Sequence, residues 1–471
     1  MVSRPNILLI MTDQQRYDAP GYYRGNGSSD TPRLDQLAAS GVVFDSAYSS
    51  DTACIPARSS LMTGLLPHRV PTGGWRPRAQ TDSGRALREG YWTLAHALRD
   101  AGYRTGLFGK MHFAPIRAQH GFDVMQTCEH LPAGYDPSEQ DDYRRWILST
   151  GRKDLRFVQP AQPKVFPYPM DAHPTRWITR HALEFLQGGQ QAGSSDGATA
   201  PWFAVVSYTD PHTPFSPPEP YASMYLPAEQ VIPESTIDSN RGLPWPFSDI
   251  MQRRDRGAFF APQRTDQHSA DYVRRVLAAI RAAIRHVDDA MAQILQAVNL
   301  DETLVVFLSD HGDYGGHRGF LGKIPWLPFD DLARIPFVIG GAGVAGGRRL
   351  SAPVQSFDYV ATVLDRVGLA RPCGDMDAVS LLPVLAGADA DTTRAVFCAT
   401  MEGTPMLRRG RYKHIWHSIA DAHILYDLEE DPEETRNIAA EPRHRDLLAA
   451  NVEVLREVLA RPVPDLWRTG A

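Results

Sequence analysis

Cysteine is scarce in this sequence of 471 residues, which has four, at positions 54, 128, 373 and 398. No two of them form a C-x-x-C pair, and four are too few for a disulfide scaffold in a chain of this length. The composition therefore excludes a small disulfide-stabilised fold and favours a reducing compartment. We expect a cytoplasmic protein.

Long apolar runs and blocks of like charge are also missing. The first apolar run, within 1–15, is short and leads directly into acid and amide groups, so it predicts neither a signal peptide nor a membrane span. The formal net charge of −6 at pH 7 is spread over interspersed acidic and basic residues. Without a basic stripe, nucleic acid is not an expected partner, whereas a small molecule is.

Short apolar runs are present, and they organise the chain. Hydrophobic residues make up 43% of the sequence, which is enough for a sizeable core. Continuous runs of strand length are typical of parallel strands that are buried on both faces. Four such runs lie at 6–14, 201–212, 303–313 and 335–341. Helical patterns between them lie at 94–101, ended by Gly102, and at 273–298.

This alternation of strands and helices predicts an α/β fold with a mostly parallel central sheet that is covered by helices on both faces. Ligands of such sheets bind outside the carboxyl ends of the strands. After about residue 390, short strands and an amphipathic helix around 447–459 predict a smaller C-terminal α+β subdomain. We therefore divide the chain into a larger domain at 1–390 and a subdomain at 391–471.

Polar residues end three of the four apolar runs. We expect Asp13, Gln14, His212, Asp310 and His311 at the carboxyl edge of the sheet. Apart from His212, these residues form an oxygen-rich set with one imidazole, which suits Ca²⁺, Mg²⁺ or Mn²⁺ more than a thiolate-bound metal. A strand-terminal Asp such as Asp13 is also often only a helix cap or a turn former.

The segment DTACIPARSSLMTG at 51–64 places one of the few cysteines at the start of a predicted short helix. Pro56 suits the first helical turn, so Cys54 lies near the N-cap, where free backbone N–H groups and the helix dipole favour an anion. Arg58 adds a planar cation. Taken alone, Cys54 is more often a small buried hydrophobic residue than a nucleophile.

A series of motifs resembles those of the type I sulfatases of the alkaline phosphatase superfamily. CIPARSSLMTG at 54–64 resembles their C-x-P-x-R motif, and GYRTGLFGKMH at 102–112 resembles their second motif, a strand that ends in Gly-Lys-x-His. The blocks MTDQ, DPHTPF, SDHGDYGGH and LGK follow the order of the family, and LYDLEEDPEETRNIA resembles a sulfatase ending. The resemblance implies that the domain at 1–390 is catalytic.

The same resemblance implies that Cys54 is not used as a cysteine. In this family a formylglycine-generating enzyme oxidises the residue to Cα-formylglycine, and the hydrated aldehyde, a gem-diol, is the nucleophile. That enzyme would recognise Cys54, Pro56 and Arg58 before the chain folds. Ala57 stands where the family commonly has Ser.

The metal ligands implied by the resemblance are the ones that the strand ends bring together. One divalent cation, Ca²⁺ first and Mn²⁺ or Mg²⁺ as alternatives, would be bound by Asp13, Gln14, Cys54, Asp310 and His311.

Roles for the remaining residues also come from the resemblance. Arg58 and Lys110 would hold the diol and the metal ligands. Lys323 and His212 would contact the sulfate and protonate the leaving oxygen, and His112 would deprotonate the second hydroxyl. The alternative for each histidine is a hydrogen-bonded structural role.

Two departures from the common family pattern bear on the substrate. Gln14 stands where many sulfatases have a second Asp, and His311 stands where many have Asn. In both respects the sequence resembles choline sulfatases and phosphonate monoester hydrolases. The GKMH segment, by contrast, has the lysine and the histidine that are usual in true sulfatases, Lys110 and His112. We therefore expect hydrolysis of the sulfate ester of a small organic molecule. A phosphonate monoester or phosphodiester hydrolase is the alternative, and a pseudoenzyme is disfavoured because every expected catalytic position is filled.

The sequence leaves the alcohol half of that ester open. Aromatic residues that could line its site, although core packing is the more common role for each, are Trp75, Trp245, Trp326 and Phe329. Because this family often forms dimers or tetramers, a homo-oligomer is a further expectation.

Overall fold

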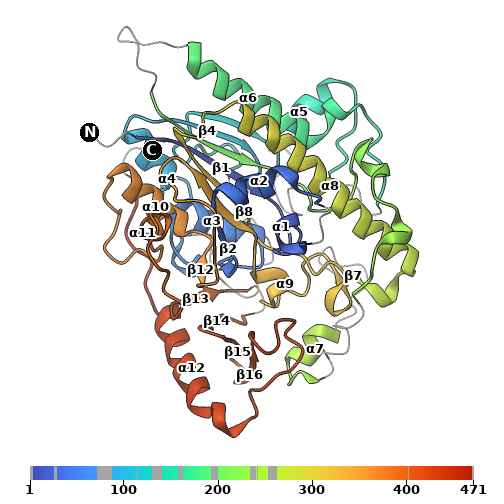
Figure 1. The fold of residues 1–471 in the computed structure, drawn as a ribbon, viewed down its shortest axis with the longest axis vertical. Helices are drawn as coiled ribbons and strands as arrows, with labels where there is room; N and C mark the ends of the chain where they lie inside the picture. Colours follow the sequence, from blue (N-terminus) through green and yellow to red (C-terminus); the bar gives the residue numbers. More distant parts are fainter. Residues whose placement is uncertain are drawn as a thin grey trace.

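A large sheet with helices on both faces forms the centre of the molecule, and a small sheet lies beside it (Figure 1). The computed structural model describes residues 4–25, 29–71, 87–113, 115–129, 140–156, 163–191, 200–233, 240, 242–252, 263–400 and 403–468. Trp75 lies outside these described residues.

The large sheet has eight strands in the order β11-β2-β10-β8-β1-β6-β4-β5. Strands β8, β1, β6, β4 and β5 pair in parallel, which confirms the predicted α/β fold with a mostly parallel sheet. The strands are β1 (Asn6–Thr12), β2 (Val42–Phe44), β4 (Arg104–Gly109), β5 (Val124–Thr127), β6 (Trp202–Ser207), β8 (Thr303–Ser309), β10 (Phe337–Gly341) and β11 (Arg348–Leu350).

The prediction that the run at 335–341 forms a parallel strand was wrong, because β10 is antiparallel to both β8 and β2. Parallel neighbours require a crossover connection, usually a long helix that packs on the sheet. The connection from β8 to β10 contains only short elements, such as β9 (Phe320–Leu321) and α9 (Asp330–Ala333). The chain therefore enters β10 from the edge at which β8 ends.

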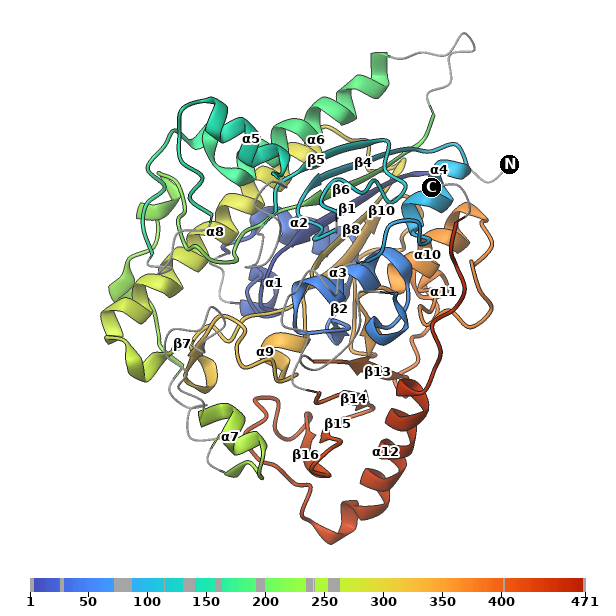
Figure 2. The same cartoon turned by 180° about the vertical axis from the view of Figure 1, so that it is seen from behind.

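Helices cover the two faces of the large sheet in separate groups. Figure 1 shows α2, α6 and α8 on one face, and Figure 2 shows α3, α4 and α10 on the other. The longer helices are α2 (Pro32–Ser40), α3 (Cys54–Thr63), α4 (Leu94–Asp100), α5 (Asp142–Ser149), α6 (Pro174–Gln191), α8 (Ala270–Gln296), α10 (Asp358–Val367) and α12 (Arg445–Leu459). The shorter ones are α1 (Gly21–Arg24), α7 (Phe247–Gln252), α9 and α11 (Leu382–Leu385).

Side chains of the central strands alternate between two cores. In β1, Leu8 and Ile10 belong to the cluster of α2, α6 and α8, whereas Ile7 and Leu9 belong to the cluster of α3, α4 and α10. All four side chains are fully buried. Burial on both faces explains why the strand sequence is a continuous apolar run rather than an alternating one.

The predicted helices at 94–101 and 273–298 are confirmed as α4 and α8. Each begins at a side-chain cap: Thr93 accepts a hydrogen bond from the backbone N–H of His96, and Ser269 accepts one from that of Tyr272. Among the helices in the described part of the chain, none has both the length and the apolar composition that crossing a bilayer requires.

The C-terminal region forms an antiparallel sheet in the order β13-β14-β15-β16, with α12 beside it. Its strands are β13 (Ala395–Cys398), β14 (Met406–Arg409), β15 (Tyr412–His417) and β16 (Ala422–Asp427). The smaller α+β region is thus confirmed, while its boundary at 390/391 stays a prediction. Two further pairs are β3 (Ala47–Tyr48) with β12 (Val354–Gln355), and β7 (Gln263–Arg264) with β9.

Buried ion pairs connect this small sheet to the large one. Lys413 of β15 is fully buried, and its Nζ lies 2.7 Å from Asp330 Oδ1 and 2.6 Å from Glu434 Oε1. Arg318, also buried, lies 3.3 Å from Asp331 and 3.6 Å from Glu434. Since Asp330 and Asp331 begin α9, the network fixes the connection between β8 and β10 against the small sheet.

Replacing Lys413 with Met should lower the free energy of unfolding by about 3–5 kcal/mol, because two buried carboxylates lose their shared cation. Urea denaturation followed by circular dichroism measures the change. The matched control is Arg443→Gln, which breaks an exposed pair with Glu441 and should cost about 1 kcal/mol or less. Equal stability of Lys413→Met and the wild type would contradict this account of the network.

Candidate active site

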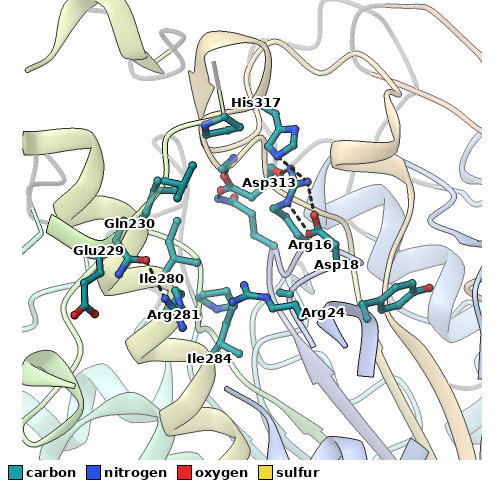
Figure 3. A pocket seen from close by; sticks show the side chains of 18 residues that line it. Arg16, Asp18, Arg24, Glu229, Gln230, Ile280, Arg281, Ile284, Asp313 and His317 are labelled. Carbon is teal, nitrogen blue, oxygen red and sulfur yellow. Dashed lines mark hydrogen bonds and ion pairs between the residues drawn. The ribbon is translucent and has the colours of Figure 1, made fainter. Parts of the chain in front are cut away.

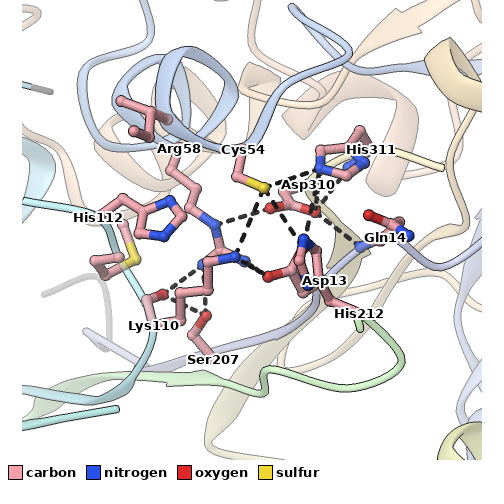
Figure 4. A network of polar contacts seen from close by, with 12 residues as sticks. Asp13, Gln14, Cys54, Arg58, Lys110, His112, Ser207, His212, Asp310 and His311 are labelled. Atoms are coloured by element: carbon pink, nitrogen blue, oxygen red, sulfur yellow. Dashed lines mark hydrogen bonds and ion pairs between the residues drawn. The ribbon is translucent and has the colours of Figure 1, made fainter. Parts of the chain in front are cut away.

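The ends of neighbouring parallel strands bring the predicted residues together. Asp13 and Gln14 follow β1, Asp310 and His311 follow β8, and Lys110 follows β4. These strands lie in the order β8-β1-β6-β4, so their carboxyl ends meet at one edge of the sheet. The prediction that Asp13, Gln14, Asp310 and His311 share this edge is confirmed, and Lys110 lies with them (Figure 4).

Cys54 reaches this site from α3, of which it is the first residue. The expected position near the helix N-terminus is therefore confirmed. All ten residues of α3 are buried, so packing on every side fixes the start of the helix. Cys54 Sγ lies 3.1 Å from His311 Nε2, 2.6 Å from Lys323 Nζ and 3.6 Å from Lys110 Nζ.

The side chains of Asp13, Cys54, Asp310 and His311 can all face one ion, since their ligand atoms lie within 4.8 Å of one another. His311 Nδ1 lies 2.9 Å from the carbonyl oxygen of Gly312, so Nδ1 donates and Nε2 is left as a ligand atom towards Cys54. Two carboxylates and an imidazole fit a divalent cation.

Gln14 can add an amide oxygen to this ligand set. Its backbone N–H donates to Asp310 Oδ1 at 3.0 Å, and its side-chain NH₂ donates to Asp313. The amide oxygen is then the acceptor that remains. The backbone of Gln14 is left-handed, with φ of 67°, a conformation that residues other than glycine adopt rarely and mainly where the surrounding structure fixes it.

Arg58 connects the ligands to the strands that carry them. Its guanidinium is fully buried, and Nε lies 2.8 Å from Asp310 Oδ2 while Nη2 lies 3.5 Å from Asp13 Oδ2. Nη1 donates to Ser207 Oγ at 2.8 Å and to the carbonyl oxygen of Lys110. One planar cation thus contacts the ends of β1, β4, β6 and β8.

Electrostatics in this site favour negative charge. Burial opposes ionisation of Asp13, yet Lys110, which donates a hydrogen bond to it, His212 and Arg58 hold its pKa well below the ordinary value. Burial and Asp13 would raise the pKa of Cys54, but Lys110 and other nearby cationic groups hold it well below the ordinary value. The centre can therefore stabilise an anion at residue 54.

His212 and Lys323 lie at the half-buried side of the site. Lys323 Nζ is 3.4 Å from His212 Nε2 and 3.1 Å from His311 Nε2. His212 Nδ1 lies 2.8 Å from the carbonyl oxygen of Thr213, so Nε2 is the ring nitrogen directed towards Lys323. Lys323 thus contacts Cys54, and His212 lies beside Lys323.

Sequence comparison agrees with this arrangement of residues. The family model named Sulfatase matches residues 5–369, and the model of the N-sulphoglucosamine sulphohydrolase C-terminal region matches 326–461. The chain belongs to the sulfatase family. The resemblance found in the motifs is therefore confirmed, including its placement in the alkaline phosphatase superfamily.

Individual relatives of this sulfatase cover almost its whole length. A choline-sulfatase of Rhizobium meliloti is 29% identical, over 93% of this chain and 83% of the relative. An arylsulfatase of Clostridium perfringens is 25% identical, over 97% of this chain and 94% of the relative. Among solved structures, a phosphonate monoester hydrolase of Agrobacterium radiobacter has a TM-score of 0.75 at 26% identity, over 97% of this chain and 95% of that one.

His112 of this sulfatase is held by a carboxylate that the sequence did not reveal. Glu129, 1% exposed, accepts hydrogen bonds from the backbone N–H groups of Met111 at 2.8 Å and His112 at 3.0 Å. The φ of His112 is 58°, in the left-handed region, and its Nε2 lies 3.8 Å from Glu129 Oε2. Glu129 therefore fixes the backbone of His112 and lies next to its ring.

Ser207 and Asp313 are two further residues that sequence reasoning missed. Ser207 ends β6 and donates a 2.6 Å hydrogen bond to the carbonyl oxygen of Lys110. Asp313 accepts from Gln14 and from the backbone N–H of Gly315 at 2.6 Å. Like the predicted residues, both lie at or just after the end of an apolar run in the sequence, so the same pattern could have identified them. Glu129 has no such signal.

A cavity of about 560 Å³ borders this sulfatase site next to Gln14 and Asp313. Figure 3 shows Ile280 of α8 on one side of it, with Arg16 and Asp18 on the other. Arg16 Nε lies 2.8 Å from Asp18 Oδ1, so the charges in this wall are paired. An apolar wall with internally paired charges suits a small organic group.

The aromatic candidates for a substrate wall take different positions. Phe329 is fully buried in a hydrophobic cluster, which supports the core role. Trp245 is 67% exposed, and Trp326 is half-buried, with its carbonyl oxygen 3.4 Å from Thr52 Oγ1.

Burial raises the pKa of Glu129 to about 7. Because the folded state then binds a proton more tightly than the unfolded chain, the contribution of Glu129 to stability is present below about pH 4.5 and is lost as the pH rises through 7. The stability of the wild type relative to Glu129→Gln should thus fall by up to ~3 kcal/mol between these pH values. Urea denaturation at several pH values measures this, with exposed Glu453→Gln as the control; a flat difference would contradict it.

Proposed function

We propose that this member of the sulfatase family hydrolyses the sulfate ester of a small organic molecule, with residue 54 acting as Cα-formylglycine. The observation that carries the proposal is the position of the Cys54 side chain, at the N-terminus of α3 and within 3.6 Å of both Lys110 and Lys323. A sulfuryl group bound to residue 54 would have its oxygens among these cations.

The chemistry of the modified residue accounts for both halves of the reaction. One hydroxyl of the gem-diol attacks sulfur, and the bond from sulfur to the alcohol oxygen breaks as that oxygen takes a proton. The second hydroxyl then loses its proton, the bond from carbon to the sulfated oxygen breaks, and sulfate leaves. Water rehydrates the aldehyde. A plain alcohol or thiol at position 54 has no second hydroxyl for this elimination.

One divalent cation belongs to the proposal, Ca²⁺ first, with Mn²⁺ or Mg²⁺ as alternatives. Asp13, Gln14, Asp310 and His311, together with residue 54, would hold it. When bound, such a cation neutralises negative charge and makes a nearby hydroxyl more acidic. Arg58 and Lys110, which contact the two carboxylates, keep this ligand set in position.

His212 is the proposed acid for the leaving oxygen, and Lys323 is its partner. His212 Nε2 lies 3.4 Å from Lys323 Nζ, and both residues are half-buried whereas Cys54 is 5% exposed, so a substrate would reach residue 54 past this pair. His112, held by Glu129, is the proposed base for the second hydroxyl. Burial, reinforced by Lys110, holds the pKa of His112 well below the ordinary value, so the ring is neutral and able to accept a proton.

A phosphonate monoester or phosphodiester is the second candidate substrate. It is favoured by the similarity to the Agrobacterium radiobacter structure, at a TM-score of 0.75. Sulfuryl and phosphoryl groups are both tetrahedral and differ mainly in charge. In either case, the cavity beside Gln14 is the candidate site for the alcohol half. Maturation by a formylglycine-generating enzyme, location in the cytoplasm and a homo-oligomeric state stay predictions.

A substrate panel tests the proposed function directly. It contains aryl sulfates, choline sulfate, sugar sulfates and a phosphonate monoester, each measured with the matured enzyme. We expect the highest kcat/KM for one of the sulfate esters. A higher value for the phosphonate than for every sulfate would favour the second candidate, and turnover of none of them would contradict both.

Removal of divalent cations should abolish turnover, because the ligand atoms of Asp13, Asp310 and His311 lie close enough together to bind one ion. Ca²⁺, Mg²⁺ or Mn²⁺ should restore it, and Zn²⁺ should restore less because most of the ligands are oxygens. Initial rates after dialysis against a chelator measure the effect. Asp310→Asn should need more cation for half-maximal activity, whereas Asp365→Asn, on the far helix α10, should not. Full activity of metal-free protein would make the ligand cluster purely structural.

The two histidines should respond differently to the leaving group. If His212 protonates the leaving oxygen, His212→Ala should slow alkyl sulfates by about 10²–10⁴-fold and spare activated nitrophenyl sulfates. His112→Ala should instead release one equivalent of alcohol quickly and then stall as the sulfated enzyme, whatever the leaving group. Rapid-quench kinetics measures both, with exposed His268→Ala as the control. A burst in His212→Ala and none in His112→Ala would reverse the two roles.

A further inference from the structure

A second group of possible metal ligands lies outside the active site. His173 precedes α6, Asp210 follows β6, and His286 lies in the middle of α8. Their exposed fractions are 4%, 9% and 0%, and their ligand atoms lie within 4.8 Å of one another. Three elements that are distant in the sequence thus direct two imidazoles and one carboxylate to a common point.

The unsatisfied ring of His286 is the strongest indication that a further atom binds between these three side chains. Within the described part of the chain, neither of its ring nitrogens has a hydrogen-bond partner, although the residue is fully buried. Leaving a buried polar group unsatisfied costs about 1–3 kcal/mol. The rings of Tyr221 and His173 lie 4.6 Å and 4.9 Å from the His286 ring, so the side chain is held in place by packing.

The spacing of His173 and Asp210 also fits a shared ion better than a direct bond. His173 Nδ1 lies 3.9 Å from Asp210 Oδ2, which is too long for a hydrogen bond. Two ligand atoms that each lie about 2.1 Å from one metal ion can be separated by this distance. His173 Nε2 lies 3.3 Å from the carbonyl oxygen of Ser216, so Nδ1 carries the lone pair. That lone pair accepts a long hydrogen bond of 3.3 Å from the backbone N–H of Thr175, which a metal ion would have to replace.

Thr175 and Ser216 orient these two ligands. The Thr175 hydroxyl donates to Asp210 Oδ2 at 2.5 Å, and the carbonyl oxygen of Ser216 lies 3.3 Å from His173 Nε2, the ring nitrogen that is not directed at Asp210. Partners of this kind orient metal ligands in proteins. Burial lowers the pKa of both histidines, so their rings are neutral near pH 7, the form that binds metals.

We propose that His173, Asp210 and His286 bind a transition metal ion of the Zn²⁺ class, separate from the cation of the active site. Two imidazoles and one carboxylate suit such an ion, whereas Ca²⁺ and Mg²⁺ prefer a set of oxygens. A void of about 20 Å³ touches His173 and Asp210 and is large enough for one water as a fourth ligand.

A bound ion would affect the active site through the backbone segment that contains both Asp210 and His212. His212 follows Asp210 by two residues, so a metal bound to Asp210 would tie the segment that carries His212 to α6 and α8. The expected role is therefore to fix the position of His212. Metal binding at this second site would be the same whichever ester the active site hydrolyses.

Cobalt tests the site, because Co²⁺ replaces Zn²⁺ and absorbs visible light when nitrogen atoms bind it. Metal-free protein is titrated with Co²⁺ in excess Ca²⁺, which occupies the active site. We expect one equivalent of Co²⁺ to bind, with visible absorption and a raised melting temperature. His286→Gln should lose all three signals, and His173→Asn, a second variant in case the first does not fold, should lose them too.

Two controls separate the sites. Asp310→Asn alters the active site and should keep the Co²⁺ signals. His120→Asn removes another buried histidine whose ring nitrogens lack described hydrogen-bond partners but which is not part of this cluster, and it should also keep them. Binding that is lost in Asp310→Asn and retained in His286→Gln would overturn the proposal. So would the absence of any Co²⁺ binding, since the cluster would then hold only water.

Discussion

The buried guanidinium of Arg58 is the interaction on which the active site depends. It contacts both carboxylates of the proposed metal site, Asp13 and Asp310, and donates to Ser207 and to the backbone of Lys110. These partners lie at the ends of four neighbouring strands. Removing the cation would leave buried Asp310 without its guanidinium partner and Asp13 with Lys110 as its remaining ion pair, which is costly. Arg58 therefore sets the spacing of the ligands as well as their charge.

A second set of buried charges extends this rigidity towards the small sheet. Asp331 at the start of α9 is shared by Arg16, which follows β1, and Arg318. The same helix start carries Asp330, which pairs with Lys413 of the small sheet. The connection between β8 and β10, which carries Lys323, is thus held by ion pairs to the end of β1 and to the small sheet. The C-terminal sheet is thus linked to Lys323, and so to Cys54, through the connection between β8 and β10.

The strand ends and the start of α3 could be predicted from the sequence, because they follow from local pattern. Continuous apolar runs place Asp13 and Asp310 at one edge, and Pro56 places Cys54 at a helix start. The direction of β10 could not be predicted, since it depends on the path of the connection and not on the strand itself. Glu129 was missed for a similar reason: its contact with His112 is purely tertiary.

The central claim is that residue 54 works as formylglycine and not as cysteine. Mass spectrometry of the tryptic peptide 34–58, with a hydrazide to capture the aldehyde, measures the modified fraction. Preparations made with different amounts of formylglycine-generating enzyme should have activities proportional to that fraction, with none in Cys54→Ala. Full activity in protein whose Cys54 is entirely unmodified would contradict the claim.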